Sequence, residues 1–211
     1  TAARGDVELA HVTFGYGEKP VLSDFSMTVK QGGQVTLVGR TGAGKSTVFR
    51  LLLGLYPPEA GTVTIGGVKV IMQMSKDKNA LACSRNFDYI QSKPGRKELL
   101  VMMNCMGVAK SWSENPSWMY DTDFEFLNSD DVTCLVCAGP RAYDYKLRLL
   151  LAGIPEEKIR LAEDEFAALE LLPLTPGEDV YILYGVDGMP LAFRVKAKLK
   201  EKLLAKGGQT Q

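Results

Sequence analysis

The stretch Gly39-Arg40-Thr41-Gly42-Ala43-Gly44-Lys45-Ser46-Thr47 decides how the first part of this chain is interpreted. It fits the pattern G-x-x-x-x-G-K-[ST], a loop whose backbone amides bind phosphate groups. The alternating apolar run at residues 34–38 favours a strand before the loop, and residues 48–53 favour a helix after it. Strand, glycine loop and helix is the context that the pattern requires. The alternative interpretation is a glycine turn between a strand and a helix.

Each position of the loop has a physical role in holding a polyphosphate. Gly42 and Gly44 allow a tight turn that aims N–H groups inward, and the helix N-terminus adds its positive dipole. Lys45 is expected to reach the outer phosphates, and the Ser46 hydroxyl to face Mg²⁺. The sequence therefore predicts that ATP is bound with Mg²⁺. The residues predicted to bind it are Gly39, Thr41, Gly42, Ala43, Gly44, Lys45, Ser46 and Thr47.

Composition narrows the class of protein and the kinds of partner. The chain has 211 residues, 45% apolar and 24% charged, which is typical of one or two soluble globular domains. Its 25 basic and 25 acidic residues cancel, so no net field attracts nucleic acid or an anionic membrane. The longest apolar runs, residues 99–103 and 149–152, are far shorter than the roughly 20 residues that span a bilayer. No basic-then-apolar leader stands at the start, and we expect a cytoplasmic protein without membrane insertion.

Cysteine and histidine give little indication of metal or nucleophilic chemistry. Cys134 and Cys137 stand in a run that favours a buried strand, residues 132–137, and two strand residues three apart point to opposite faces. We therefore expect core thiols rather than a redox or zinc pair. The only histidine, His11, is expected on a strand surface.

Residues 4 to about 67 resemble the opening third of an ABC transporter ATP-binding domain. The matching segments are VELAHVTFGYG from residue 7, VLSDFSMTVKQGGQVTLVGRTGAGKST from residue 21 and LLLGLYPPEAGTVTIGG from residue 51. The resemblance implies that Tyr16, the aromatic residue before the second strand, stacks on adenine, which a flat phenol can do. The alternative is that Tyr16 is only an aromatic residue in a turn.

This resemblance stops after residue 67. A glutamine loop, an LSGGQ signature, an apolar run ending in Asp-Glu (Walker B) and a switch histidine do not follow. ATP hydrolysis then lacks its base and its water-positioning groups, which leaves residual ATPase activity at most.

Two later segments carry a second resemblance. SENPSWMYDTDFEFL from residue 113 and AGPRAYDYKLRLLLAGIPEEKI from residue 138 resemble the C-terminal domain of MurT-type Mur ligases, the synthetase subunit of lipid II isoglutaminyl synthase. The resemblance implies docking of a glutamine amidotransferase, with Asp121 or Asp123 completing the partner's Cys-His pair. The acids at 121, 123 and 125 share one face if the segment is extended. The alternative is a solvated loop with helix-capping aspartates.

Arg141 either holds a phosphate or carboxylate, or pairs with Asp144.

The two resemblances together predict an α/β chain of mixed origin, recombined or engineered. Residues 1–67 form a phosphate-loop strand-loop-helix unit with short antiparallel strands, residues 68–205 form a Rossmann-like, mostly parallel sheet with helices on both faces, and residues 206–211 form a disordered tail. Nucleotide binding without complete ATPase or ligase machinery is the first functional hypothesis. The alternatives are a MurT-like synthetase subunit in lipid II amidation and an interaction module with a vestigial loop. The sequence predicts no oligomeric state.

Overall fold

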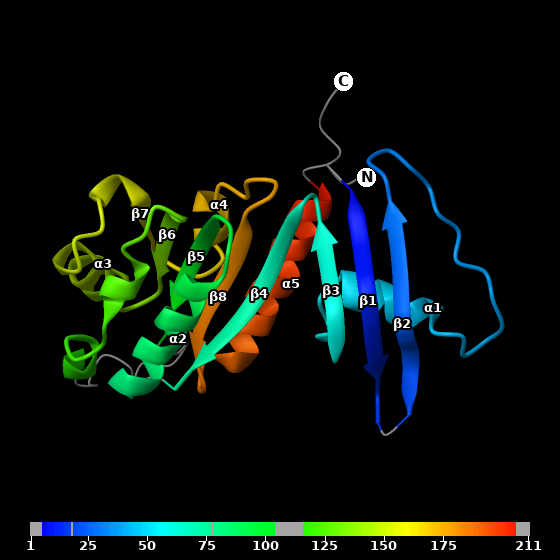
Figure 1. Ribbon diagram of the computed structural model, residues 1–211, viewed down its shortest axis with the longest axis horizontal. Coiled ribbons are helices and arrows are strands. Elements are labelled where there is room, and N and C mark those ends of the chain that lie inside the picture. Colours follow the sequence, from blue (N-terminus) through cyan, green and yellow to red (C-terminus); the bar gives the residue numbers. More distant parts are fainter. Residues whose placement is uncertain (1–5, 18, 77, 104–115, 206–211) are drawn as a thin grey trace. The chain divides into compact units, whose positions relative to one another are not determined.

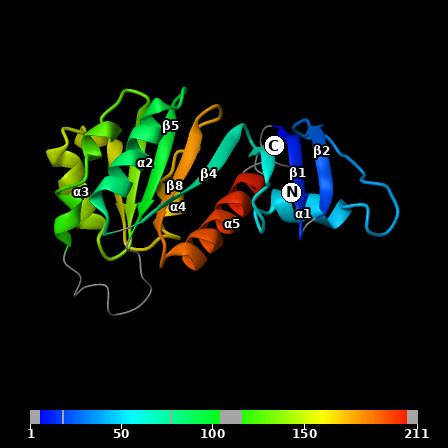
Figure 2. The same cartoon turned by 60° about the horizontal axis from the view of Figure 1, so that its bottom comes forward.

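The computed structural model describes residues 6–17, 19–76, 78–103 and 116–205 (Figure 1; Figure 2 gives a second view). The chain is α/β, as predicted, and divides into two compact units. The first unit contains residues 1–70, 175–177 and 196–211, and the second contains residues 71–174 and 178–195. The predicted tail, residues 206–211, lies outside the described residues. No described helix is long and apolar enough to cross a membrane.

The first unit is an antiparallel sheet with one helix. Strand β1 (Val7–Gly15) pairs with β2 (Pro20–Val29) on one side and with β3 (Ala60–Ile65) on the other, and β3 pairs with the start of β4 (Val68–Ser75). Helix α1 (Lys45–Leu52) packs its Val48 and Leu51 against apolar residues of the sheet. The core consists of Leu9, Val12, Phe14, Leu22, Val48, Leu51 and Val63.

The strand predicted at residues 34–38 is not formed, and this prediction was wrong. Val35 is 49% exposed and Val38 85% exposed, whereas Leu37 is half-buried against the core of the first unit. An apolar strand of this kind is stable when sheet neighbours hydrogen-bond its edges and cover its faces. Among the described residues no strand pairs with residues 34–38, so the backbone before the phosphate loop stays irregular.

The second unit is built on four parallel strands in the order β8-β5-β6-β7, formed by β5 (Lys97–Met102), β6 (Val132–Ala138), β7 (Ile159–Ala162) and β8 (Asp179–Gly185). The chain enters at β5, runs outward to β7 and returns on the other side of β5 as β8. Every residue of β5 is buried, so both faces of the sheet are covered. This order is that of half a Rossmann fold, which agrees with the predicted class.

Helices α2 (Ala80–Ser92) and α3 (Ala142–Leu151) share one apolar core with the sheet. The 3₁₀ helices η2 (Pro116–Met119) and η3 (Phe124–Leu127) contribute to the same core. The remaining elements are η4 (Glu156–Lys158), α4 (Ala168–Leu171) and α5 (Met189–Ala205), the last of which divides between the two units after Val195.

The cysteine prediction is confirmed for the described residues. Cys134 and Cys137 are both buried and unbonded, and only Cys137 belongs to the core under α2 and α3. Burial raises the pKa of Cys134 to about 11 and that of Cys137 to about 12, so both remain protonated thiols at neutral pH. No group of metal-ligating side chains is present in the part of the chain that the structure describes.

Candidate functional site

The phosphate loop turns directly into the N-terminus of α1, as the sequence predicts. Gly44 is the N-cap residue with φ of 83°, and a Cβ atom there would lie 2.9 Å from Leu22 Cδ2, so glycine is required. Thr47 and Val48 donate to the Gly44 carbonyl and begin the helix. Among the described contacts, the amides of Gly42, Gly44, Lys45 and Ser46 have no hydrogen-bond partner. Four donors without a partner at a helix N-terminus are the kind of arrangement that favours an anion.

Lys45 is folded back onto its own loop. Its Nζ donates to the Gly39 carbonyl at 2.7 Å and to the Arg40 carbonyl at 2.8 Å. The ammonium group therefore lies within the loop already. Binding of a phosphate would exchange these carbonyl contacts for contacts to phosphate oxygens.

A solvent-open hollow of about 390 Å³ lies over the loop. It is lined by Tyr16, Val21, Thr41, Gly42, Gly44, Lys45, Ser46 and Thr47. Seven of these residues were predicted from the sequence. Gly39 and Ala43 belong to the loop but do not line the hollow, and Val21 was missed. Its place, immediately after the turn that carries Tyr16, was the available signal.

Tyr16 lies beside the loop and is held there by polar contacts from α1. Arg50 Nη1 donates to the phenol oxygen at 3.0 Å, and the Thr47 hydroxyl lies 3.3 Å from the same oxygen. These contacts, first that of Thr47 and then that of Arg50, lower the pKa of Tyr16. Arg50 was not predicted; its position three residues after Thr47, on the same side of the helix, was the available signal.

The ring of Tyr16 belongs to an aromatic cluster. It makes edge-to-face contacts with Phe14 at 5.0 Å and with Tyr56 at 5.3 Å between centroids, and it is half-exposed. Arg50 Cζ lies 5.8 Å from the ring centroid. The ring therefore has a fixed position next to the phosphate loop and retains exposed aromatic surface.

The acidic segment is not extended, so the condition under which its three acids were expected to share one face is not met. Asp121 lies in a turn after η2, and Asp123 is the residue that precedes η3. The residues between the three acids, Thr122 and Phe124, are buried, and the acids themselves are exposed. Asp123 makes no side-chain capping bond to η3. The carboxylates of Asp121 and Asp123 have no partner among the described residues, unlike that of Glu125.

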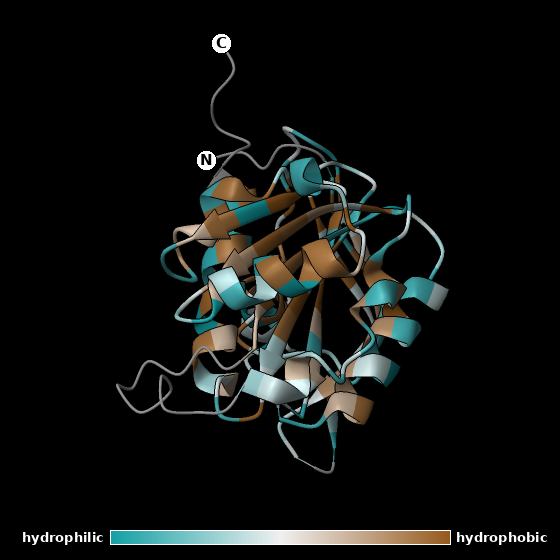
Figure 3. Cartoon of the chain, turned by 90° about the vertical axis from the view of Figure 1, so that its left-hand side faces the viewer, coloured by the Kyte–Doolittle hydropathy of each residue, from teal (hydrophilic) through white to brown (hydrophobic). Residues whose placement is uncertain are grey.

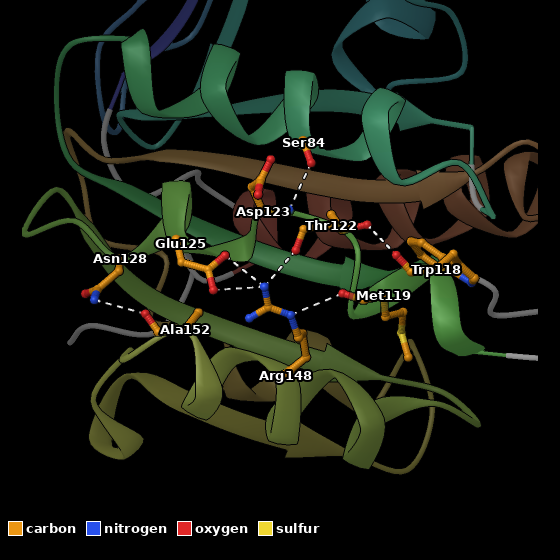
Figure 4. A network of polar contacts seen from close by, with 9 residues as sticks. All are labelled: Ser84, Trp118, Met119, Thr122, Asp123, Glu125, Asn128, Arg148 and Ala152. Carbon is orange, nitrogen blue, oxygen red and sulfur yellow. Dashed lines mark hydrogen bonds and ion pairs between the residues drawn. The ribbon is translucent and has the colours of Figure 1, made fainter.

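Arg148 of α3 locks this segment in place (Figure 4). Its Nε donates to the Met119 carbonyl at 3.1 Å, and Nη2 donates to the Thr122 carbonyl at 2.7 Å and to the Glu125 carboxylate at 2.8 and 2.9 Å. The amide of Asp123 donates to Ser84 Oγ of α2 at 2.9 Å. Arg148 lowers the pKa of Glu125 by this contact. One buried guanidinium thus fixes the backbone on both sides of Asp121.

Arg141 pairs with Asp144, with its Nη1 3.1 Å from the carboxylate, which is the second of the two predicted alternatives. His11 lies on the strand surface, as predicted, and its Nδ1 lies 2.7 Å from Asp24. Both residues of this pair have positive φ, at a bulge between β1 and β2.

The outward side of α3 is apolar. Tyr143, Leu147, Leu150 and Leu151 are 78%, 49%, 37% and 63% exposed, and their spacing places them on one side of the helix, away from Tyr145 and Leu149 in the core. Figure 3 shows the chain coloured by the hydropathy of each residue, with the left-hand side of Figure 1 facing the viewer. We call these four residues the α3 stripe. An apolar stripe of this size marks a candidate protein-docking surface.

Comparison with known proteins gives a different relative for each part of the chain. Residues 77–187 match the family "MurT ligase C-terminal". The chain is also 37% identical over 103 residues to Nod factor export ATP-binding protein I of Sinorhizobium fredii, covering 48% of this chain and 30% of that protein. It is 47% identical over 64 residues to the mitochondrial iron-sulfur clusters transporter atm1 of Neurospora crassa, covering 30% of this chain and 9% of that protein.

A solved bacterial Atm1-family ABC exporter with ATP bound aligns with all of this chain and 43% of the exporter, at 16% identity and a TM-score of 0.29. The chain spans a third or less of the length of the curated relatives named above. The family match and the two sequence relatives confirm the resemblance to the MurT C-terminal family and to ABC ATP-binding proteins, and the architecture is mixed.

Proposed function

The chain belongs to the MurT ligase C-terminal family through residues 77–187 and resembles ABC ATP-binding proteins in its first part, and from this premise we propose that it binds ATP with Mg²⁺ at the phosphate loop. The observation that carries the proposal is the set of unpartnered amides at Gly42, Gly44, Lys45 and Ser46, at the positive end of α1. Amides and dipole together favour the binding of a negatively charged phosphate group.

The remaining groups have assigned roles in this proposal. Lys45 leaves its own loop carbonyls and binds the outer phosphates, Ser46 presents its hydroxyl to Mg²⁺, and Tyr16 offers its exposed ring surface to the adenine. No side chain lining the hollow is a carboxylate or a histidine. A general base for water is therefore missing from the described lining, so we propose binding with negligible hydrolysis.

Titration of ATP and Mg²⁺ into the full chain tests the proposal. Lys45→Ala removes charge-assisted hydrogen bonds, each worth about 1.5–3 kcal/mol, and should weaken binding by roughly 10- to 100-fold. Arg40→Ala is the matched control, because it removes a cation from the same loop at a position that does not line the hollow. Equal affinity for Lys45→Ala and the unaltered chain would contradict the proposal. If titration of ATP and Mg²⁺ released no heat with the unaltered chain or with Lys45→Ala, an interaction module with a vestigial loop would be favoured.

A second candidate function is the docking of a glutamine amidotransferase subunit, and it is favoured by the rigid presentation of two free carboxylates. Asp121 and Asp123 are exposed on a segment that Arg148 holds in place. The α3 stripe lies on the same helix as this arginine. A carboxylate held in this way can orient the histidine of a partner's Cys-His pair, which is the role of the third residue in such sets.

Copurification and a glutaminase assay with such a subunit separate docking from catalysis. Leu147→Lys, in the middle of the α3 stripe, should prevent the complex. Asp121→Asn and Asp123→Asn should leave the complex intact, and one of them should reduce glutaminase activity by roughly 10²- to 10⁴-fold. Asp130→Asn, another exposed aspartate after η3, is the control. Full activity of both asparagine variants would show that neither carboxylate acts on the partner.

A further inference from the structure

Residues 34–38, Gln-Val-Thr-Leu-Val, have the composition of a strand and none of the usual protection against pairing with another chain. The segment contains two valines, a threonine and a leucine, carries no charge and includes no proline. Short segments of high strand propensity and low charge form intermolecular sheets when they are exposed. We call residues 34–38 the unpaired segment.

The backbone of the unpaired segment is available for hydrogen bonding. Within the described chain, no N–H or carbonyl group of residues 34–38 has a hydrogen-bond partner. Hydrogen bonds begin again only at Gly39 and Arg40, whose carbonyls accept from Lys45. Leu37 holds the segment against the core of the first unit, while Val35 and Val38 extend into solvent. The segment is therefore tethered with its polar backbone accessible.

The neighbouring strand β2 is a less favourable site for pairing. Within the first unit β2 pairs only with β1, so its other edge is open. Strand β2 is distorted by register shifts in its ladder with β1 and by Asp24, which has φ of 50° and an exposed carboxylate in contact with His11. Bulges and charges of this kind are the devices that keep sheet edges from pairing. The unpaired segment lacks both devices.

We propose that the unpaired segment forms an intermolecular β-ladder with the same segment of a second copy of this chain. A second copy fits because an uncharged strand meets its own sequence without repulsion between like charges. Pairing would satisfy the backbone groups of residues 34–38 in both copies. Such a short ladder gives weak association, since a dissociation constant of about 1 mM corresponds to only about 4 kcal/mol. This proposal does not depend on nucleotide binding.

Sedimentation velocity over a concentration series tests the ladder with variants at Thr36. Thr36→Pro removes a backbone donor in the middle of the segment and should weaken dimer formation at least tenfold. Thr36→Val is the matched control, because it keeps the donor and the strand propensity, and it should associate like the unaltered chain. Residue 36 is exposed and unpaired, so neither change affects the fold of the monomer, which far-UV circular dichroism checks.

Charge variants of Thr36, the central residue of the segment, give a second, independent measurement. Thr36→Lys and Thr36→Glu should each be monomeric alone, because residue 36 faces its own copy in a ladder centred on the segment, and an equimolar mixture of the two should regain the dimer. The proposal is overturned if the unaltered chain is monomeric throughout, or if Thr36→Pro associates as strongly as Thr36→Val. It is also overturned if Leu147→Lys, in the α3 stripe, abolishes association while Thr36→Pro does not.

Discussion

Replacement of Arg148 by methionine is expected to destabilise the second unit by roughly 2–5 kcal/mol, because two hydrogen bonds from a charged donor to backbone carbonyls are lost, each worth about 1.5–3 kcal/mol, while each carbonyl keeps one backbone donor. The carbonyls are those of Met119 and Thr122, in residues that are each 1% exposed. Methionine keeps much of the apolar volume of the arginine side chain, so the loss of packing is small. Both tryptophans of the chain lie outside the first unit, so urea unfolding followed by tryptophan fluorescence reports on the second unit.

Glu125→Gln is the matched control for the ion pair. The Glu125 side chain is 56% exposed, so its pairing with Arg148 is screened by solvent and should contribute less than about 1 kcal/mol. The folded-state pKa of Glu125 is lowered, so this small contribution is present above the unfolded pKa and is lost as the pH falls through the folded value. If Glu125→Gln cost as much as Arg148→Met, the ion pair rather than the carbonyl contacts would hold the segment.

Replacement of Lys200 by methionine is expected to stabilise the first unit at neutral pH, by up to about 4 kcal/mol, since one pKa unit corresponds to about 1.4 kcal/mol. Lys200 is 4% exposed, and its Nζ donates to the Leu51 carbonyl at the end of α1 at 3.1 Å. Burial, together with the nearby Lys196 ammonium, lowers the pKa of Lys200 from 10.5 to about 7. The lost hydrogen bond to Leu51 offsets part of the gain.

The lowered pKa of Lys200 also determines whether the stability of the first unit rises or falls with pH. The unfolded chain keeps Lys200 protonated up to about pH 10.5, while the folded chain releases the proton near pH 7. The unfolded state therefore binds more protons between these values, and the stability of the first unit should rise with pH, by roughly 2 kcal/mol between pH 7 and pH 9. Lys200→Met should remove most of this slope and leave the part due to Lys196, whose pKa burial also lowers, whereas Lys198→Met, an exposed lysine of the same helix, should leave the slope unchanged. Hydrogen exchange of the β1 amides at several pH values measures the stability of the first unit in both variants.

The sequence predicted the elements that local pattern specifies. Strand alternation located β1 and β2, the glycine pattern located the loop and the start of α1, and the buried run at residues 132–137 located β6. Of the site residues chosen from the sequence, Tyr16 and all loop residues except Gly39 and Ala43 line one hollow. These features depend on neighbours a few residues apart or on a resemblance with fixed spacing.

The features that the sequence did not predict depend on distant partners. Residues 34–38 have strand propensity, but propensity is insufficient without neighbouring strands, so the segment stays irregular. The contacts of Arg148 with Met119 and Thr122 join residues 26 to 29 positions apart, and no local signal distinguishes this arginine from an exposed one. Val21 lies beside Gly44, where an added Cβ atom would be 3.3 Å from Val21 Cγ1, and the two residues are far apart in the sequence.

The assignment of residues 196–205 to the first unit has a consequence during synthesis. The ribosome emits β1, β2 and α1 early, but the helical turns that carry Lys200 to the Leu51 carbonyl are among the last described residues to be made. Domains usually fold in the order of translation. Here the first unit cannot close until residues 196–205 have been made, so truncation shortly before residue 196 would release nascent chains in which β1 and β2 lack this helical cover.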